Sequence, residues 1–355
     1  MKRTLAGMYL SLWVVAVTVQ AAEAPVADVL QRPALPVTAP TKAVLIDVGR
    51  AGDRLVAVGE QGLILLSDDN GHSWRQVPVP TSVSLTAVTF PNASQGWVVG
   101  HGGLVLHSTD AGRSWTVQLD GQAAAQRELE AASAVDDGSP GARRRLDSAR
   151  ALVAEGADKP WLAAYFANER EGTLVGAFGL VLHTRDGGAS WQSWMDRLQN
   201  PAGNHLYAIT GRDQQLYVAG EQGTLWGSDD GGEHFRRLPS PYEGSFFTLG
   251  LKADGELLAA GLKGNVWRSR DQGRHWQRVE NVFASNIVAV RTALDGNLML
   301  ADQSGRLLQA SDKGELRQQG NAVGNAPAAM AQTADGRWLV VGARGLERVE
   351  QVTSP

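Results

Sequence analysis

Residues 99–115 read Val-Gly-His-Gly-Gly-Leu-Val-Leu-His-Ser-Thr-Asp-Ala-Gly-Arg-Ser-Trp, and this stretch decides the fold. It joins a Gly-x-x-Gly turn to a short apolar run and then to the phrase Ser/Thr-x-Asp-x-Gly, usually followed by an aromatic residue. The Asp phrase occurs five times with its aromatic residue and once in a shorter form, at 67–74, 108–115, 184–191, 228–235, 269–276 and 310–314. Several short strands repeated at a fixed period are typical of a β-propeller.

The spacing of the central aspartates gives the number of repeats. Asp69 and Asp110 are 41 residues apart, and the same spacing of 41 separates Asp230 from Asp271. A last unit without the Asp phrase is visible at 338–346. Seven periods account for the chain once an insertion after the second unit is set aside. The sequence therefore predicts an all-β protein, a seven-bladed β-propeller.

One unit, residues 84–120, shows how the repeat builds a blade. Residues 85–90 and 96–100 are apolar strands joined by a turn, and the second ends at the Gly-x-x-Gly hairpin. Residues 104–107 form a third strand, the Asp phrase a turn, and residues 114–117 the fourth strand. Short β-rich runs separated by Gly, Asn and Asp turns predict an antiparallel four-stranded blade.

The repeated aspartate is predicted to have a structural role. Its carboxylate can accept hydrogen bonds from N–H groups of its own turn, and the glycine two residues later tolerates a positive φ. The aromatic residue that ends the phrase can then be buried in the seam of the blade. Catalysis or calcium binding is the alternative. A residue that recurs at an equivalent place in every unit favours the structural role.

The N-terminus is typical of an exported protein. Two basic residues precede an apolar run at 5–19, and a small-residue cleavage site ends at Ala21. Residues 1–21 are therefore predicted to be a signal peptide, and residues 22–355 the propeller, in the periplasm or secreted. An uncleaved membrane anchor is the alternative, although the apolar run is shorter than the roughly 20 residues that span a bilayer.

Composition excludes several kinds of chemistry. The chain has no cysteine, which excludes disulfides, cysteine-ligated zinc, thiol catalysis and a lipid-modified cysteine. Loss of Lys2 and Arg3 with the signal peptide leaves 31 basic against 37 acidic residues, a net charge of −6, so no nucleic-acid partner is expected. The seven histidines are scattered without paired ligand spacing, and no metal or other cofactor is predicted.

The coupled Gly-x-x-Gly and Asp phrases carry a resemblance. Together they resemble the photosystem II stability/assembly factor family of Asp-box propellers, also called bacterial neuraminidase repeat propellers, over about residues 43–349. The resemblance implies seven blades and a non-enzymatic role in the assembly of a membrane complex. Family members that serve photosystem II are often lipid-anchored, whereas this chain lacks the cysteine for that modification.

Residues 121–159 interrupt the β pattern. Residues 122–134 and 142–155 have helical composition and spacing and flank an Asp-Gly-Ser-Pro turn, so the insertion is predicted to be a helical hairpin between blades two and three. It contains the basic cluster Arg143, Arg144, Arg145 and Arg150. These arginines either dock a partner, as insertions into rigid scaffolds often do, or form a solvated face that balances Glu128 and Glu130.

Propeller geometry places this insertion on the same face as the Gly-x-x-Gly hairpins. The connections between blades and the hairpins between second and third strands emerge on one side of a propeller, and the Asp-box turns emerge on the other. The hairpins share their glycines but differ in the residues at their tips, which are Glu60, His101, Phe178, Glu221, Lys263, Asp302 and Arg344. These tips are candidate binding residues, with a merely solvated loop as the alternative.

The sequence favours a monomeric binding scaffold for an envelope or membrane protein, such as an exporter or an assembly intermediate, at most peripheral to the membrane. The alternative is a glycoside hydrolase, because sialidases and xyloglucanases also contain Asp-boxes. Most glycosidases need two carboxylates about 5–10 Å apart, and sialidases need motifs that are missing here. No catalytic residue is assigned. Finally, residues 29–37 are predicted to supply an outer strand to blade seven, whose own sequence ends near Val349.

Overall fold

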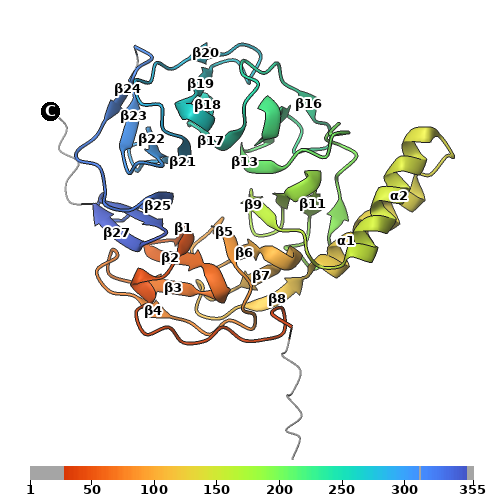
Figure 1. Cartoon of the computed structure of the whole chain (residues 1–355), viewed down its shortest axis with the longest axis horizontal. Helices are drawn as coiled ribbons and strands as arrows, with labels where there is room; N and C mark the ends of the chain where they lie inside the picture. Colours follow the sequence, from red (N-terminus) through yellow and green to blue (C-terminus); the bar gives the residue numbers. More distant parts are fainter. Residues whose placement is uncertain (1–27, 312, 350–355) are drawn as a thin grey trace, which may run out of the picture.

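The computed structural model describes residues 28–311 and 313–349, which form seven sheets around a central channel (Figure 1). The predicted signal peptide lies outside the described residues. Each sheet is an antiparallel meander whose spatial order follows the chain, from an inner strand at the channel to an outer strand at the rim. The seven-bladed fold predicted from the repeat is therefore confirmed.

The first four blades contain, from the inner strand outward, β1 (Leu45–Ala51), β2 (Arg54–Gly59), β3 (Ile64–Ser67) and β4 (Arg75–Gln76); β5 (Leu85–Thr89), β6 (Gly96–Gly100), β7 (Val105–Ser108) and β8 (Thr116–Leu119); β9 (Trp161–Phe166), β10 (Gly172–Gly176), β11 (Val181–Thr184) and β12 (Gln192–Ser193); and β13 (Leu206–Arg212), β14 (Gln215–Gly220), β15 (Leu225–Ser228) and β16 (Arg236–Arg237).

The remaining blades contain β17 (Phe246–Leu251), β18 (Leu257–Gly261), β19 (Val266–Ser269) and β20 (Gln277–Arg278); β21 (Ile287–Thr292), β22 (Leu298–Asp302), β23 (Leu307–Ala310) and β24 (Leu316–Gln318); and β25 (Pro327–Gln332), β26 (Trp338–Gly342) and β27 (Gly345–Val349). Each inner strand contacts the inner strands of both neighbouring blades, so the ring is closed.

The two faces of the disc differ in the turns that they carry. We call the face with the turns between second and third strands the hairpin face, and the opposite face the box face. Five hairpins contain a short 3-10 turn, namely η2 (Glu60–Gly62), η3 (His101–Gly103), η4 (Ala177–Gly179), η5 (Glu221–Gly223) and η6 (Leu262–Gly264).

Each of the first five Asp-boxes is a closed hydrogen-bonded turn, as the first one shows. The Oδ1 atom of Asp69 accepts the backbone N–H of Ser73 at 2.9 Å and the hydroxyl of Ser67 at 2.8 Å. Hydrogen bonds from the side chain and backbone of Ser73 and from Ser67 lower the pKa of Asp69 to about 2. The carboxylate therefore stabilises its own turn, which confirms the structural interpretation of the box.

The aromatic residue of each box fills the seam with the preceding blade. Trp115 is 5% exposed and packs in one cluster with Val56 and Leu66 of blade one. Its Nε1 donates to the carbonyl of Gly112 at 3.0 Å, so the indole is satisfied as well as buried. The box thus joins a turn on the box face to the apolar contact between two blades.

Within the described residues, the ring closes between blades seven and one without an added strand. Among the described residues blade seven has three strands, and its Leu339 and Val341 share a core cluster with Leu45 of blade one. The prediction that residues 29–37 complete blade seven is wrong. That segment runs along blade one, where the N–H of Ala34 donates to the carbonyl of Val79 at 3.0 Å.

The reason is the apolar side of this N-terminal segment. Leu30 and Ala34 pack against the cluster between blades one and two, and the N–H of Ser82 donates to the carbonyl of Val29 at 2.9 Å. Burial of these two side chains favours the seam between blades one and two over the edge of blade seven.

Candidate binding site on the hairpin face

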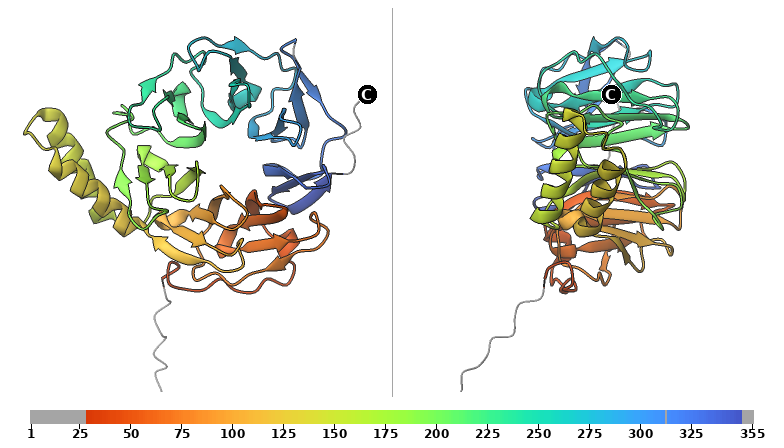
Figure 2. Two further views of the ribbon diagram at one scale, coloured as in Figure 1. Left: turned by 180° about the vertical axis from the view of Figure 1, so that it is seen from behind. Right: turned by 90° about the vertical axis from the view of Figure 1, so that its right-hand side faces the viewer.

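The insertion is a helical hairpin, α1 (Gly121–Ala134) and α2 (Pro140–Glu155), that projects beyond the rim of the disc (Figure 1). Asp120 caps α1 through the N–H of Ala123 at 2.9 Å, and Ser139 caps α2 through the N–H of Ala142 at 3.2 Å. Helix α1 contacts η3, and the edge-on view places both helices toward one face (Figure 2). The predicted hairpin and its position on the hairpin face are confirmed.

One of the four arginines holds the insertion to the propeller. Arg145 Nε lies 2.8 Å from Oε1 of Glu128, a carboxylate whose side chain is 4% exposed and which also accepts the hydroxyl of Ser193 in blade three. The hydrogen bonds that Arg145 donates to Glu128 raise the pKa of Arg145. Arg145 therefore balances a buried acid, whereas Arg143, Arg144 and Arg150 lie on the exposed surface of α2.

The hairpin tips also divide into exposed and engaged residues. The tips that are exposed on the surface are Glu60, His101, Phe178, Lys263 and Arg344. Asp302 is 0% exposed, and the expectation that it is displayed is wrong. Its carboxylate accepts the N–H groups of Ser304 and Arg306 and pairs with the Arg306 guanidinium at 2.9 Å, because this hairpin must close without the 3-10 turn of blades one to five.

Aromatic side chains form a row across the hairpin face of blades three to five. We call Phe178, His205, Tyr207 and Phe247 the aromatic row. Successive ring centroids are 4.8, 6.3 and 5.6 Å apart, and each pair meets edge to face. The row extends from the tip of η4 to the mouth of the central channel. Only Phe178 was a predicted site residue.

Glu221, at the start of η5, lies beside this row. Its carboxylate accepts the backbone N–H of His205 at 2.8 Å and the hydroxyl of Tyr207 at 3.2 Å. Burial and the negative charge of Glu221 raise the pKa of Tyr207 to about 12. Among residues 28–311 and 313–349, these two uncharged donors are the hydrogen-bond partners of the Glu221 carboxylate, and no basic side chain forms an ion pair with it. Glu221 is therefore a half-buried carboxylate beside the aromatic row.

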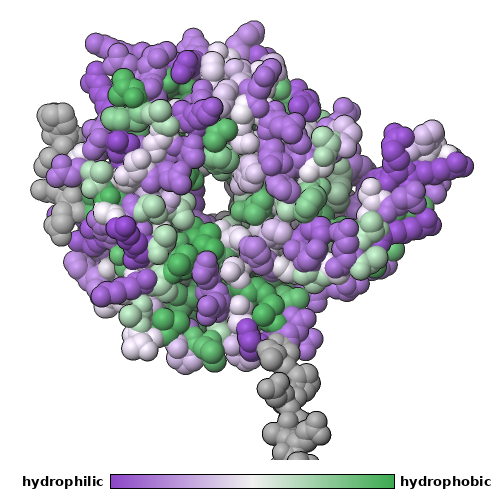
Figure 3. All heavy atoms as spheres, viewed as in Figure 1, coloured by the Kyte–Doolittle hydropathy of each residue, from purple (hydrophilic) through white to green (hydrophobic). Residues whose placement is uncertain are grey.

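The channel mouth on this face has an apolar collar. A register shift near the start of each inner strand turns one side chain toward the channel, and the collar consists of Ile46, Thr86, Leu162, Tyr207, Phe247, Val288 and Ala328. The collar opens into a cavity of about 560 Å³. Apolar atoms border part of the opening in Figure 3.

Below the collar, the channel holds an ion pair. Arg291 of blade six donates to Asp47 of blade one at 2.8 Å, and Asp47 also accepts the N–H of Val88 at 2.9 Å. Arg291 passes in front of blade seven, whose inner strand presents the small residues Ala328 and Ala329. This pair ties together the two blades that flank the three-stranded one.

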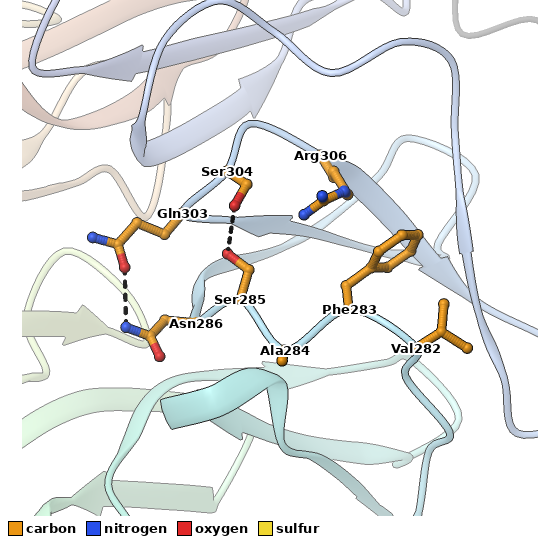
Figure 4. A pocket seen from close by; sticks show the side chains of 8 residues that line it. All are labelled: Val282, Phe283, Ala284, Ser285, Asn286, Gln303, Ser304 and Arg306. Atoms are coloured by element: carbon orange, nitrogen blue, oxygen red, sulfur yellow. Dashed lines mark hydrogen bonds between the residues drawn. The ribbon is translucent and has the colours of Figure 1, made fainter.

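A second hollow, of about 500 Å³, lies on the hairpin face between blades five and six (Figure 4). Ser304 donates to Ser285 at 3.0 Å and Asn286 donates to Gln303 at 3.0 Å, so the polar groups of its floor pair with one another. The guanidinium of Arg306 covers the ring of Phe283 at 4.5 Å. The polar and aromatic groups of this hollow are therefore largely paired with one another, whereas the charge of the Glu221 carboxylate has no cationic partner among the described residues.

The part of the chain that the structure describes contains no cluster of three or more His, Cys, Asp or Glu side chains that could hold a metal ion. It also contains no helix that is long and apolar enough to cross a membrane.

Comparison with known proteins identifies the family. The family described as photosynthesis system II assembly factor YCF48 matches residues 28–133 and 151–242, which is more than half of the chain and leaves out most of α2. The chain belongs to this YCF48 family. A curated relative, the photosystem II assembly lipoprotein Ycf48 of Synechococcus sp. (strain CC9902), is 34% identical over 73 residues. That match spans 21% of this chain and 22% of the relative.

Solved structures agree on the fold. YCF48 bound to D1 peptide has a TM-score of 0.63 at 17% identity, covering 90% of this chain and 99% of that one. YCF48 from Cyanidioschyzon merolae has a TM-score of 0.61 at 16% identity, covering 88% and 96%. The GH74 enzyme of Niastella koreensis also has a TM-score of 0.63, at 14% identity, but the match covers 53% of that chain. At these identities the likeness shows the propeller fold alone.

Proposed function

We propose that this chain is a non-enzymatic scaffold, located outside the cytoplasm, that binds a segment of an envelope or membrane protein during assembly or transport. Membership of the YCF48 family supports the assembly role. One solved relative is described as bound to a D1 peptide, which supports a peptide segment as the bound species. The exposed arginines of the insertion and the aromatic row are the candidate contacts.

The observation that carries this proposal is the uneven hairpin face. The blades repeat one frame, yet on this face a projecting helical hairpin and the aromatic row depart from the repeat. The helical hairpin lies beside blades two and three, and the row runs from blade three to blade five. Departures from a repeated frame that add exposed aromatic and basic groups are typical of recognition surfaces.

The channel favours binding over glycoside hydrolysis. Asp47 is the carboxylate that lines the described part of the channel, and it is paired with Arg291. Most retaining and inverting glycosidases use two carboxylates, one of which must exchange a proton with the substrate. A single carboxylate held by an arginine and a backbone N–H does not provide that pair.

The test is recovery of a partner from envelope extract by the tagged protein. Replacement of the whole insertion would uncover the seam in which Ala124 and Ala125 are buried, so point substitutions are preferable. The variant carries Arg143→Glu, Arg144→Glu and Arg150→Glu and keeps Arg145, which pairs with Glu128.

A control variant carries the same change of charge elsewhere. It has Arg113→Glu, Arg274→Glu and Arg278→Glu, three exposed positions in box turns and an outer strand. We expect the insertion variant to lose most of the partner while the control keeps it, and recovery by the wild type to decrease with salt. Equal recovery of one specific partner by all three proteins would reject the insertion as a contact.

A further inference from the structure

Phe178 occupies a position that disfavours its residue type. It is the tip of η4, with φ 55° and 54% of its surface exposed. In the other four 3-10 turns, the second residue has the same left-handed conformation, and it is Gln61, Gly102, Gln222 or Lys263. A left-handed conformation is costly for a bulky residue, and exposure of the ring adds to the cost. Such a residue favours a role for its side chain at the surface.

The aromatic row is held in place before any ligand arrives. His205 Nδ1 accepts the backbone N–H of Phe178 at 2.8 Å, which fixes the tip and leaves the proton of the neutral ring on Nε2. Glu221 fixes the middle of the row through the N–H of His205 and the hydroxyl of Tyr207. Preorganised aromatic side chains bind with little loss of conformational entropy.

The unmatched charge at this place is negative. Lys159 lies 5.2 Å from the centre of the Phe178 ring, but it is already paired with Glu155 at 2.7 Å and Asp158 at 2.6 Å. In the part of the chain that the structure describes, the carboxylate of Glu221 is bound only by two uncharged donors. Each of its oxygens has a lone pair left for a further hydrogen bond.

We propose that the aromatic row and Glu221 together form a binding site for an arginine or lysine side chain carried by an extended peptide segment. A guanidinium can stack on the faces of aromatic rings and donate two parallel hydrogen bonds to a carboxylate. The flanking apolar residues of the peptide would contact Phe178 on one side and the collar on the other. The inference rests on the proposed binding function and specifies the partner's chemistry.

Titration of the full-length mature protein with synthetic peptides tests this inference separately from the pull-down. The probe is the capped peptide Ac-Gly-Phe-Arg-Phe-Gly-NH₂, and its matched control has citrulline in place of arginine, which keeps the shape and removes the charge. We expect the wild type to bind the arginine peptide at least about tenfold more tightly, the range for a partly buried charge pair. Glu221→Gln should abolish that preference.

The chain provides a matched control for the carboxylate. Glu60→Gln makes the same change in the Glu-Gln-Gly turn of blade one, where the side chain is exposed and has no aromatic row beside it. This variant should keep the preference of the wild type. If Glu60→Gln also lost the preference for the arginine peptide, the preference would be a long-range effect of net charge. Glu221 would then not be the binding site of the cation.

Phe178→Gln tests the aromatic part without endangering the fold. Glutamine already occupies this left-handed position in blades one and four. The variant should be at least as stable as the wild type and yet bind both peptides several-fold more weakly. A protein that binds them unchanged would overturn the role of the row.

Two further results would reject the proposal. Equal affinity of the wild type for the arginine and citrulline peptides would show that the site does not recognise a positive charge. Displacement of the peptide by cellohexaose would show that the row binds a saccharide. A failed titration combined with intact partner recovery that depends on the α2 arginines would refute this inference and leave the proposed function standing.

Discussion

Blades one and four turn through the same three residues, Glu-Gln-Gly, and the two turns have almost the same backbone. The φ angles of Gln61 and Gln222 are 55° and 52°. The N–H of each glutamate donates to the carbonyl 16 residues earlier, that of Val44 at 3.3 Å and that of His205 at 3.0 Å. The side chains differ, because Glu60 is exposed and Glu221 is half-buried.

The difference comes from the inner strand and not from the turn. In blade one the residues beside the glutamate are Val44 and Ile46, and in blade four they are His205 and Tyr207. Tyr207 supplies a hydroxyl donor to the carboxylate that Ile46 lacks, beside the backbone N–H of His205. The two aromatic rings also carry the row onward to the channel mouth. The turn sequence thus determines the backbone conformation, and the residues at the start of the inner strand determine which groups surround the glutamate.

The largest expected effect is a loss of stability when the hairpin backbone shared by blades one and four is altered. Gly62 and Gly223 have φ values of 75° and 68°, and an added Cβ would lie 2.2 Å from the carbonyl oxygen of Thr81 and 1.9 Å from that of Tyr242. Alanine at either position should lower the free energy of unfolding by about 1–3 kcal/mol through backbone strain, and the clash adds to this. Denaturant unfolding measures the change.

Gly336 is the matched control for this prediction. It has φ 82° and no atom within 4 Å of an added Cβ, so Gly336→Ala introduces the strain without the clash. The two hairpin variants should be clearly less stable than this control. Equal stability of all three would mean that the hairpins yield easily and do not form a rigid frame.

The repeated frame was open to prediction because the same interactions recur in the sequence. The glycines form the hairpins, the Asp-boxes form the turns and the apolar runs form the strands. The spacing of these features predicts seven blades. The helical hairpin was also predicted, since its composition differs from that of the strands around it. The path of residues 29–37 was not, because it depends on how Leu30 and Ala34 pack against a cluster that exists only once blades one and two have formed.

The site was harder to predict than the frame. His205 directly precedes β13, Tyr207 lies in β13 and Phe247 lies in β17, so the three meet only when blades four and five pack. A clue was present in the repeat itself, since the positions of His205 and Tyr207 are occupied by Val44 and Ile46 in blade one. Conversely, Asp302 and Arg145 look exposed in sequence but pair with Arg306 and Glu128 in the fold.

A smaller effect is expected from the boxes, which should act alike in both blades. Hydrogen bonds from Ser73 lower the pKa of Asp69 to about 2, and the pKa of Asp230 is also lowered to about 2, by hydrogen bonds from His234 that outweigh burial. The unfolded chain takes up protons near pH 4 and the folded boxes only near pH 2. Stability should therefore be complete above about pH 4 and decrease as the pH falls toward 2.

Thermal unfolding from pH 5 to pH 2 measures this dependence. Asp69→Asn and Asp230→Asn should each flatten the acid branch of the stability curve by a similar amount, because each removes one carboxylate with a lowered pKa. An effect of Asp69→Asn alone would show that the two boxes are not equivalent and that the frame also varies between the blades.

The smallest effect on stability is expected where the two turns differ most. Glu60→Gln removes an exposed charge and should change the free energy of unfolding by less than about 0.5 kcal/mol. Glu221→Gln leaves only one acceptor oxygen for two donors, the N–H of His205 and the hydroxyl of Tyr207. It should cost about 0.5–1.5 kcal/mol, the usual value of one hydrogen bond. Paired denaturant curves measure both changes. If the two substitutions cost the same, Glu221 does not hold the aromatic row in place, and the contrast between the two blades is one of exposure alone.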